Sequence, residues 1–375
     1  MSSSWNKLFA RYEKENPGVH VVFTGYDATT YPTVLKTGLS GSNGPDLVML
    51  HPYSSIKPYV DAGQIQPLTT KEVPGLATAF TPDSLAASKV DGKQYGVPFA
   101  QQTVQVFYNK DIFSKVGVKP PATPREVEPM LKKLAAAGYT PISVTGKDSW
   151  QLVNVFDALD GPTYGGRKWV EGARAGKAHA SDPAFVSALD QFKALSKYFP
   201  QNVTGVNYAD SQALFSSGKA ALFPGGSWEL AGFESANPSL KIGVFSMPTA
   251  DGKTPTWGYE DGSIGLSAKS AHSAAAIKLM NWMTTAEFGE AFTNELKQVS
   301  SVKGVKVSDP VLNQMITDYQ AAPVPMIWVT DYFGVSSPAP YAALMNGAQG
   351  ILLGTQSPTQ VGAAIDQSIT QFTQG

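Results

Sequence analysis

Aromatic, amide and acidic side chains recur in this sequence beside short apolar segments that are typical of buried β-strands. They are His51, Tyr53, Gln101, Gln102, Asp148, Trp150, Trp228, Trp257, Tyr259, Glu260 and Asp261. In an open α/β sheet, ligands bind at the carboxyl ends of the strands, so we expect these side chains to meet in one cleft. Aromatic faces pack against the C–H faces of a sugar ring, while amides and carboxylates pair with its hydroxyl groups. The sequence therefore predicts a site for a neutral sugar.

Three of the tryptophans are predicted to contact this ligand. Trp150, Trp228 and Trp257 lie beside Gly, Ser or Asp residues and outside any helical pattern of apolar positions. A tryptophan packs more often in a core than against a ligand, so this polar neighbourhood is what favours a binding role. The tryptophans that we expect to be structural are Trp5, Trp169 and Trp282.

Four of the polar candidates have a second interpretation. Gln101 and Gln102 either face the ligand or form hydrogen bonds with backbone groups of their loop. Glu260 and Asp261 either accept hydrogen bonds from sugar hydroxyls or belong to a turn or hinge. As ligand acceptors, the two carboxylates would weaken sugar binding toward about pH 4, because a protonated carboxyl accepts fewer hydrogen bonds.

Sequence signatures of common enzymes and metal sites are absent. The sequence has no glycine-rich nucleotide-binding motif, no His-Glu-x-x-His, no Gly-x-Ser-x-Gly and no cysteine, and its four histidines lie far apart. We therefore expect no metal and no cofactor. A glycoside hydrolase is the alternative from another class, since it needs two carboxylates roughly 5 to 10 Å apart. The acids available for such a pair are Asp148, Glu229, Glu260 and Asp261.

The charge of the chain limits its partners. The 375 residues include 29 Lys and Arg against 30 Asp and Glu, which gives a net charge of −1. Nucleic acids and anionic membranes attract proteins with a basic excess, so neither is an expected partner. A receptor for a peptide or polyamine would need several acids in its cleft, whereas the amide-rich loops favour a neutral ligand.

The length of the chain permits two lobes, because domains usually contain about 100 to 200 residues. No run approaches the roughly 18 apolar residues of a membrane-spanning helix, and Met1–Trp5 does not open a signal peptide. We interpret the sequence as a cytosolic protein or as a mature chain whose export signal has been removed.

Short apolar segments alternate with amphipathic helices, which predicts an α/β fold. Val19–Phe23 and Leu47–Leu50 are predicted strands, and a helix over 31–39 separates them. Buried strands joined by helices are typical of a parallel sheet with both faces covered. The apolar spacing of Trp5, Leu8, Phe9 and Tyr12 predicts an N-terminal helix. Further strands are predicted near 103–108, 142–144, 220–223, 241–245 and 263–267, with a hairpin around Asp91-Gly92 and mainly helices after 272.

Several short segments follow one another in a characteristic order. They are Asn16–Val21, Gly44–Val48, Ala62–Leu68, Asp91–Pro98, Tyr108–Phe113 and Gly218–Leu222. Together they resemble the extracellular solute-binding proteins of carbohydrate ABC importers, the family of maltose-binding protein. The resemblance covers residues 5 to about 300 by these segments and the C-terminal helices by pattern.

This resemblance implies a two-lobed, periplasmic-binding-protein-like α/β fold with three crossings between the lobes and a sugar bound between them. The lobes would comprise residues 1–108 with 266–322 and residues 109–265 with 323–375. Positions that match ligand-contacting residues of the family are His51, Tyr53, Trp150, Trp228 and Tyr341. Members of the family usually begin with a strand whose loop contributes ligand contacts, whereas this sequence opens directly on a helix.

The resemblance also implies a biological setting. It implies a monomeric, non-enzymatic receptor outside the cytoplasm, in the periplasm or lipid-anchored at the cell surface. Such a receptor binds a mono- or oligosaccharide with high affinity, closes by hinge motion and delivers the ligand to the transmembrane subunits of an ABC permease.

Overall fold

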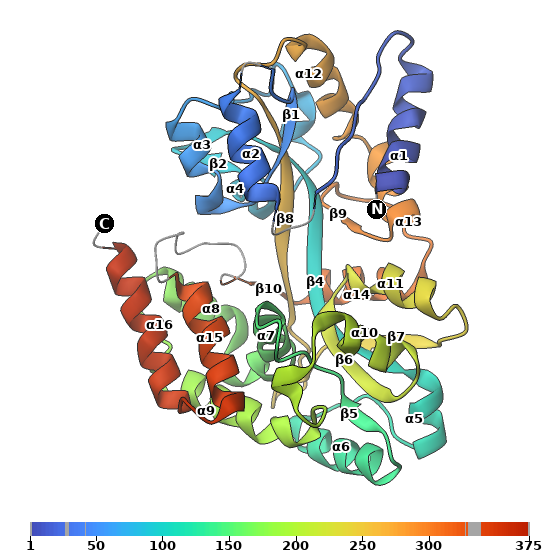
Figure 1. The fold of residues 1–375 in the computed structure, drawn as a ribbon, viewed down its shortest axis with the longest axis vertical. Helices are drawn as coiled ribbons and strands as arrows, with labels where there is room; N and C mark the ends of the chain where they lie inside the picture. Colours follow the sequence, from blue (N-terminus) through green and yellow to red (C-terminus); the bar gives the residue numbers. More distant parts are fainter. Residues whose placement is uncertain (1, 27–29, 42, 327, 329–338, 374–375) are drawn as a thin grey trace. The chain divides into compact units, whose positions relative to one another are not determined.

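The computed structural model describes residues 2–26, 30–41, 43–326, 328 and 339–373 (Figure 1). The chain divides into two compact units, of which unit 1 comprises residues 1–101 and 260–309, and unit 2 comprises residues 102–259 and 310–375. The chain therefore passes from one unit to the other three times, as the resemblance implies.

The passages lie after Gln101, Tyr259 and Asp309, each upstream of the position that the resemblance implied. Strands β4 (Val97–Asn109) and β8 (Thr256–Leu266) explain two of these differences, because each strand contributes residues to both units. The sequence analysis placed these two boundaries near the ends of β4 and β8. The structure places them inside the two strands, where the contacts of the chain change from one unit to the other.

Unit 1 combines six helices and a small sheet within its described residues. Its helices are α1 (Ser2–Glu15), α2 (Tyr31–Ser40), α3 (Lys57–Asp61), α4 (Pro82–Ala86), α12 (Ser273–Trp282) and α13 (Ala286–Leu296), with 3₁₀ turns at Tyr53–Ser55 and Pro74–Ala77. Its own strands are β1 (Leu47–Leu50), β2 (Lys89–Val90), β3 (Lys93–Gln94) and β9 (Val299–Ser300). Strand β1 pairs antiparallel with β8, and β9 pairs antiparallel with β4.

The predicted apolar face of the N-terminal helix is confirmed in unit 1. Leu8, Phe9 and Tyr12 of α1 are buried against α12 and α13, where the ring of Tyr12 lies 5.2 Å from that of Trp282. The predicted hairpin is also confirmed: Asp91 and Gly92 link β2 to β3 with φ angles of 48° and 76°. A turn with two left-handed residues matches the twist of a two-stranded ribbon.

The predicted strand Val19–Phe23 is wrong. This segment pairs with no strand among the residues that the structure describes. Val19, Val21 and Phe23 pack partly buried against the core of unit 1, while Val22 is 80% exposed. Buried and exposed side chains therefore alternate as they would in a strand. A β-branched sequence nevertheless forms a strand only where a neighbouring strand pairs with its backbone.

Unit 2 holds most of the helices. They are α5 (Lys110–Val116), α6 (Val127–Ala136), α7 (Trp150–Tyr164), α8 (Gly166–Arg174), α9 (Pro183–Leu195), α10 (Tyr208–Ser216), α11 (Glu229–Ala236), α14 (Pro310–Ala321), α15 (Pro340–Leu353) and α16 (Pro358–Thr373). Short 3₁₀ turns lie at Pro124–Glu126, Ser196–Tyr198 and Val203–Gly205. Its own strands are β5 (Thr140–Ile142), β6 (Ala220–Gly226), β7 (Ile242–Phe245) and β10 (Pro323–Pro325).

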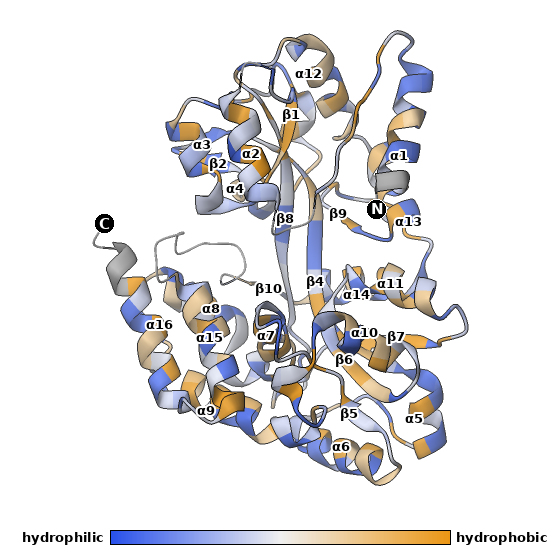
Figure 2. Ribbon diagram, viewed as in Figure 1, coloured by the Kyte–Doolittle hydropathy of each residue, from blue (hydrophilic) through white to orange (hydrophobic). Residues whose placement is uncertain are grey.

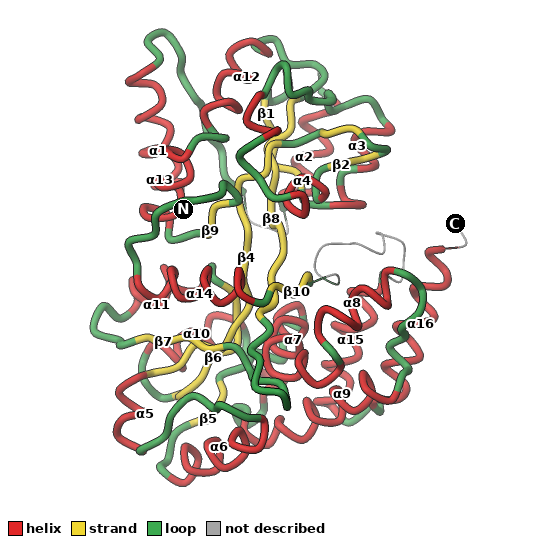
Figure 3. The backbone as a smooth tube through the Cα atoms, turned by 180° about the vertical axis from the view of Figure 1, so that it is seen from behind, coloured by secondary structure: helices red, strands yellow, loops and turns green. Residues whose placement is uncertain are grey.

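The sheet of unit 2 combines antiparallel and parallel pairs, so the prediction of a parallel sheet is wrong. Strand β4 runs antiparallel to both β6 and β7, whereas β5 is parallel to β6 and β10 is parallel to β8. The strands of unit 2 are drawn in yellow in Figure 3. A pattern of apolar runs indicates burial but does not fix strand direction.

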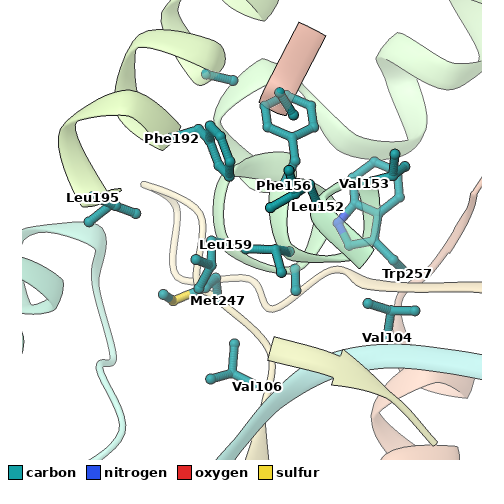
Figure 4. Packing of buried hydrophobic residues seen from close by; sticks show 14 of the residues in the cluster. Val104, Val106, Leu152, Val153, Phe156, Leu159, Phe192, Leu195, Met247 and Trp257 are labelled. Carbon is teal, nitrogen blue, oxygen red and sulfur yellow. The ribbon is translucent and has the colours of Figure 1, made fainter. Parts of the chain in front are cut away.

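Helix α7 lies in the middle of unit 2 and was not predicted from the sequence. Its packing partners include α9 and α15 as well as β6. Most of its residues are buried, including Phe156, whose ring lies 5.4 Å from that of Phe185 and 6.2 Å from that of Phe192 on α9 (Figure 4). Helices α6, α9 and α16 instead carry polar and apolar residues together, as surface helices do (Figure 2). Helix α7 is buried on most sides and has no separate apolar face, so the apolar spacing did not predict it.

Candidate functional site

Four half-buried aromatic side chains of unit 2 form a connected group, which we call the aromatic platform. It consists of Trp150, Tyr208, Trp228 and Tyr259. The ring of Trp150 meets that of Tyr208 edge-on at 4.9 Å, and the rings of Trp228 and Tyr259 lie 6.5 Å apart. The indole Nε1 of Trp228 donates to the hydroxyl of Tyr208 over 3.1 Å, which links the two pairs. The platform can therefore offer several ring surfaces to one ligand.

A buried carboxyl group lies behind the platform. Glu229, the first residue of α11, is 1% exposed, and its carboxyl accepts hydrogen bonds from the hydroxyl of Tyr208 and from Nε1 of Trp228. Its other oxygen accepts from Nε2 of Gln212 over 2.7 Å. Burial raises the pKa of Glu229 to about 7, although the three hydrogen bonds oppose that change. Burial and the neighbouring carboxylate also raise the pKa of Tyr208, which keeps its hydroxyl a donor.

The loop that carries Trp228 is fixed to strand β4. The backbone amide of Ser227 donates to the carbonyl of Thr103 over 2.8 Å, and its hydroxyl donates to Oε1 of Gln102 over 2.6 Å. Gln102 is 3% exposed within β4, so its amide supports the loop of Ser227. This contact is made with a serine side chain, whereas the second interpretation expected backbone groups of its own loop. A Cβ atom on Gly226 would lie 1.8 Å from Cζ3 of Trp228, so glycine is required for the indole to lie over the end of β6.

Tyr208 is positioned at both of its ends. Its backbone amide donates to Oδ2 of Asp148 over 2.7 Å, and its hydroxyl donates to Glu229. It opens α10, whose N-terminus is capped by the side chain of Asn207. Asp148, a predicted ligand residue, therefore anchors the segment that holds Tyr208 in the described structure.

The structure contradicts the predicted binding role of Trp257. This tryptophan is 1% exposed and packs inside unit 2, with its ring 5.5 Å from that of Tyr164 (Figure 4). A Cβ atom on Gly161 would lie 2.4 Å from its Nε1, which shows how closely α7 covers the indole. The neighbouring glycine that suggested a loop in fact belongs to strand β8. The structural roles predicted for Trp169 and Trp282 are confirmed by their burial.

Glu260 is also turned into the protein interior, so its predicted role as a sugar acceptor is contradicted. It is 5% exposed, and its carboxyl accepts hydrogen bonds from Ser84 over 2.5 Å and from Ser301 over 2.6 Å. Nε2 of Gln101 lies 3.3 Å from the same carboxyl. Burial raises the pKa of Glu260 to about 7. The network joins α4, β4 and β8 within unit 1, as expected of a structural residue beside a chain passage.

The candidates that follow β1 lie in unit 1. His51 and Tyr53 are half-buried, and the ring of His51 meets that of Tyr31 edge-on at 6.5 Å. The hydroxyl of Tyr31 donates to the carbonyl of Met49 over 2.7 Å. Tyr53 has a φ of 57°, a left-handed conformation that is costly for an aromatic residue. Such strain occurs often at ligand sites, so a binding role for these residues stays a prediction.

Two further candidates also stay predictions. Asp261 is half-buried in β8 of unit 1, and Tyr341 is half-buried in the first turn of α15, where it packs against the core of unit 2. Tyr208 was missed altogether. The helix-capping sequence Asn207-Tyr208-Ala209-Asp210 could have placed it at a helix start, but no sequence signal brings it against Trp150 or Glu229.

Metal and membrane sites find no support in the described part of the chain. No group of three or more His, Cys, Asp or Glu residues is placed to hold a metal ion there. Within the same residues, no helix combines the length and apolar character needed to cross a bilayer.

Comparison with known proteins identifies relatives across most of the chain. A "Multiple sugar-binding protein" of Streptococcus mutans is 27% identical over 316 residues, which cover 82% of this chain and 74% of the relative. The "Galactooligosaccharide-binding protein" of Bacillus subtilis is 26% identical, covering 96% of this chain and 83% of the relative.

A solved structure of a "Chitin oligosaccharide binding protein" has the same fold, with a TM-score of 0.83 at 24% identity, covering 100% of this chain and 95% of that one. Residues 1–290 match the family described as bacterial extracellular solute-binding proteins. The match extends over more than half of the chain and covers most of unit 1 and most of unit 2. The chain therefore belongs to the bacterial extracellular solute-binding protein family.

Proposed function

We propose that this protein is the receptor of a carbohydrate ABC importer and binds a neutral mono- or oligosaccharide without chemical conversion. It acts as a monomer outside the cytoplasm and delivers the sugar to the transmembrane subunits of its permease. Membership of the solute-binding family and the sugar-binding names of two relatives support this proposal. Hinge closure around the ligand is part of it and stays a prediction, which small-angle X-ray scattering with and without sugar checks.

The aromatic platform is the observation that carries the proposal. Its rings are half-buried, so they keep exposed surface while the protein holds them in place. A sugar ring has an apolar C–H face that packs on such a surface, and several adjoining rings can support more than one sugar unit.

The acids nominated for glycoside hydrolysis are mostly engaged with protein donors. Asp148 accepts from the backbone of Tyr208, Glu229 accepts from three side chains, and Glu260 accepts from two serines and lies near Gln101. A hydrolase needs one carboxyl that protonates the leaving group and a second that activates water or attacks the sugar. Carboxyls that are held inside the protein by its own donors are poor candidates for either task.

The proposal is tested by a thermal-shift screen of the purified protein against mono- and oligosaccharides, followed by calorimetry and chromatography of the mixture. We expect one class of sugar to raise the melting temperature and to be recovered unchanged. Release of shorter sugars would support the hydrolase instead. Strong weakening of binding by added salt would argue for a charged ligand, because screening acts on charge pairs and hardly on neutral contacts.

A further inference from the structure

The polar edges of two platform rings, Tyr208 and Trp228, point toward a buried carboxyl. The hydroxyl of Tyr208 and Nε1 of Trp228 both contact the same oxygen of Glu229, and the Tyr208 hydroxyl also accepts from Trp228. These two rings come from different elements, since Tyr208 opens α10 and Trp228 precedes α11. The Glu229 carboxyl and the direct hydrogen bond from Trp228 to Tyr208 therefore fix the relative orientation of two rings from different elements.

The carboxyl itself is held from the other side. Nε2 of Gln212, one helical turn after Tyr208, donates to the second oxygen of Glu229. A Cβ atom on Gly225 would lie 3.2 Å from Cγ of Glu229, so β6 closes in on its side chain as well. With 1% of its surface exposed, Glu229 has no room for direct contact with a sugar hydroxyl.

We propose that Glu229 is a positioning residue for sugar binding, which orients the rings of Tyr208 and Trp228 and commits their polar atoms to the protein. The inference rests on the proposed function. It assigns Tyr208 to the ligand surface and predicts that the platform recognises the C–H face of the sugar. Because the protons of the Tyr208 hydroxyl and of the Trp228 indole are already donated to protein groups, hydrogen-bond donors to the sugar must come from other residues.

Two substitutions separate orientation from charge. Glu229→Gln keeps an oxygen that can accept from Tyr208 and Trp228, and rotation of the Gln212 amide restores the contact at the other end. Glu229→Leu has a similar size but removes every acceptor. We expect Glu229→Gln to keep the sugar affinity within about threefold and Glu229→Leu to lower it at least about tenfold. Asp210→Asn, which removes an exposed carboxylate from the same helix as Tyr208, is the control and is expected to leave affinity unchanged.

A readout without ligand keeps this inference separate from the proposed function. The groups that contact the Glu229 carboxyl are Tyr208, Gln212 and Trp228, and Tyr208 is the one among them that titrates. Because the pKa of Glu229 lies at about 7, the indole N–H resonance of Trp228 should shift with a midpoint near that pH in the wild type and in Asp210→Asn. The shift should be absent in Glu229→Gln.

The outcomes distinguish the two ideas. If no sugar binds the wild type but the indole resonance titrates as described, the proposed function fails and the positioning of the rings stands. If sugar binds and a folded Glu229→Leu variant binds it as tightly as the wild type, the positioning role is refuted. Should Glu229→Leu not fold, Tyr208→Phe replaces it, because it keeps the ring and removes the hydroxyl that the Glu229 carboxyl holds. Sugar affinity equal to wild type in a folded Tyr208→Phe variant would also refute the role.

Discussion

Replacement of Glu260 by glutamine should make the protein more resistant to unfolding at neutral and alkaline pH. In the folded protein the Glu260 carboxyl is buried beside Ser84 and Ser301, and burial raises its pKa from 4.5 to about 7. A carboxyl with a raised pKa contributes full stability below pH 4.5, where both states are protonated. That contribution is lost as the pH rises through about 7, because the unfolded chain ionises more easily.

The size of the effect follows from the difference between the two pKa values. One pKa unit corresponds to about 1.4 kcal/mol, so the wild type should lose roughly 3 kcal/mol of unfolding free energy from this residue between pH 4 and pH 8. Glutamine cannot ionise, and its amide can still accept from one serine and donate to the other. The stability of Glu260→Gln relative to wild type should therefore rise by roughly 3 kcal/mol over the same pH range.

Urea titrations of both proteins at several pH values between 4 and 8 provide the measurement. Glu15→Gln, which removes an exposed carboxylate in the last turn of α1, is the matched control for the loss of one negative charge. A stability difference between Glu260→Gln and wild type that stays constant across this range would refute the reasoning. It would mean that the folded protein does not oppose ionisation of Glu260.

Three further predictions concern unit 2. Trp228→Ala should weaken sugar binding with little loss of stability, whereas Trp257→Ala should cost about 3 to 5 kcal/mol of unfolding free energy; calorimetry and urea titration would contradict this if the two variants behaved alike. Gly226→Ala should displace the indole of Trp228 and lower affinity about tenfold or more, while Gly232→Ala, where an added Cβ meets open space on α11, should not; equal affinities would refute the close approach. Asp160→Asn should stabilise the protein more at pH 8 than at pH 4, because burial and the charge of Asp157 raise the pKa of Asp160; melting temperatures that shift equally at both pH values would argue against it.

Local patterns predicted many elements correctly because they depend on neighbours in the sequence. The helical face of Leu8, Phe9 and Tyr12, the turn at Asp91-Gly92 and the C-terminal helices α12 to α16 all follow from spacing, turn chemistry or capping residues. Helix α7 escaped prediction because a helix that is buried on most sides has no contrast between a polar and an apolar face.

The residue types of the candidate site were visible in the sequence, but their surroundings were not. Trp228 and Trp257 both have glycine neighbours, yet Trp228 is half-buried while Trp257 is covered by α7. Glu260 looked like a sugar acceptor until the structure brought Ser84 and Ser301 to its carboxyl from positions 176 and 41 residues away.

The sequence by itself determined the α/β class, the family resemblance and the abundance of aromatic and amide side chains that suit a sugar. Only the tertiary structure decided which of these side chains keep exposed surface. It brought Tyr208 against Trp150 and Trp228, and it placed the buried Glu229 behind them. The physical reason is that burial and hydrogen bonding depend on contacts between distant parts of the chain, and such contacts leave no periodic trace in the sequence.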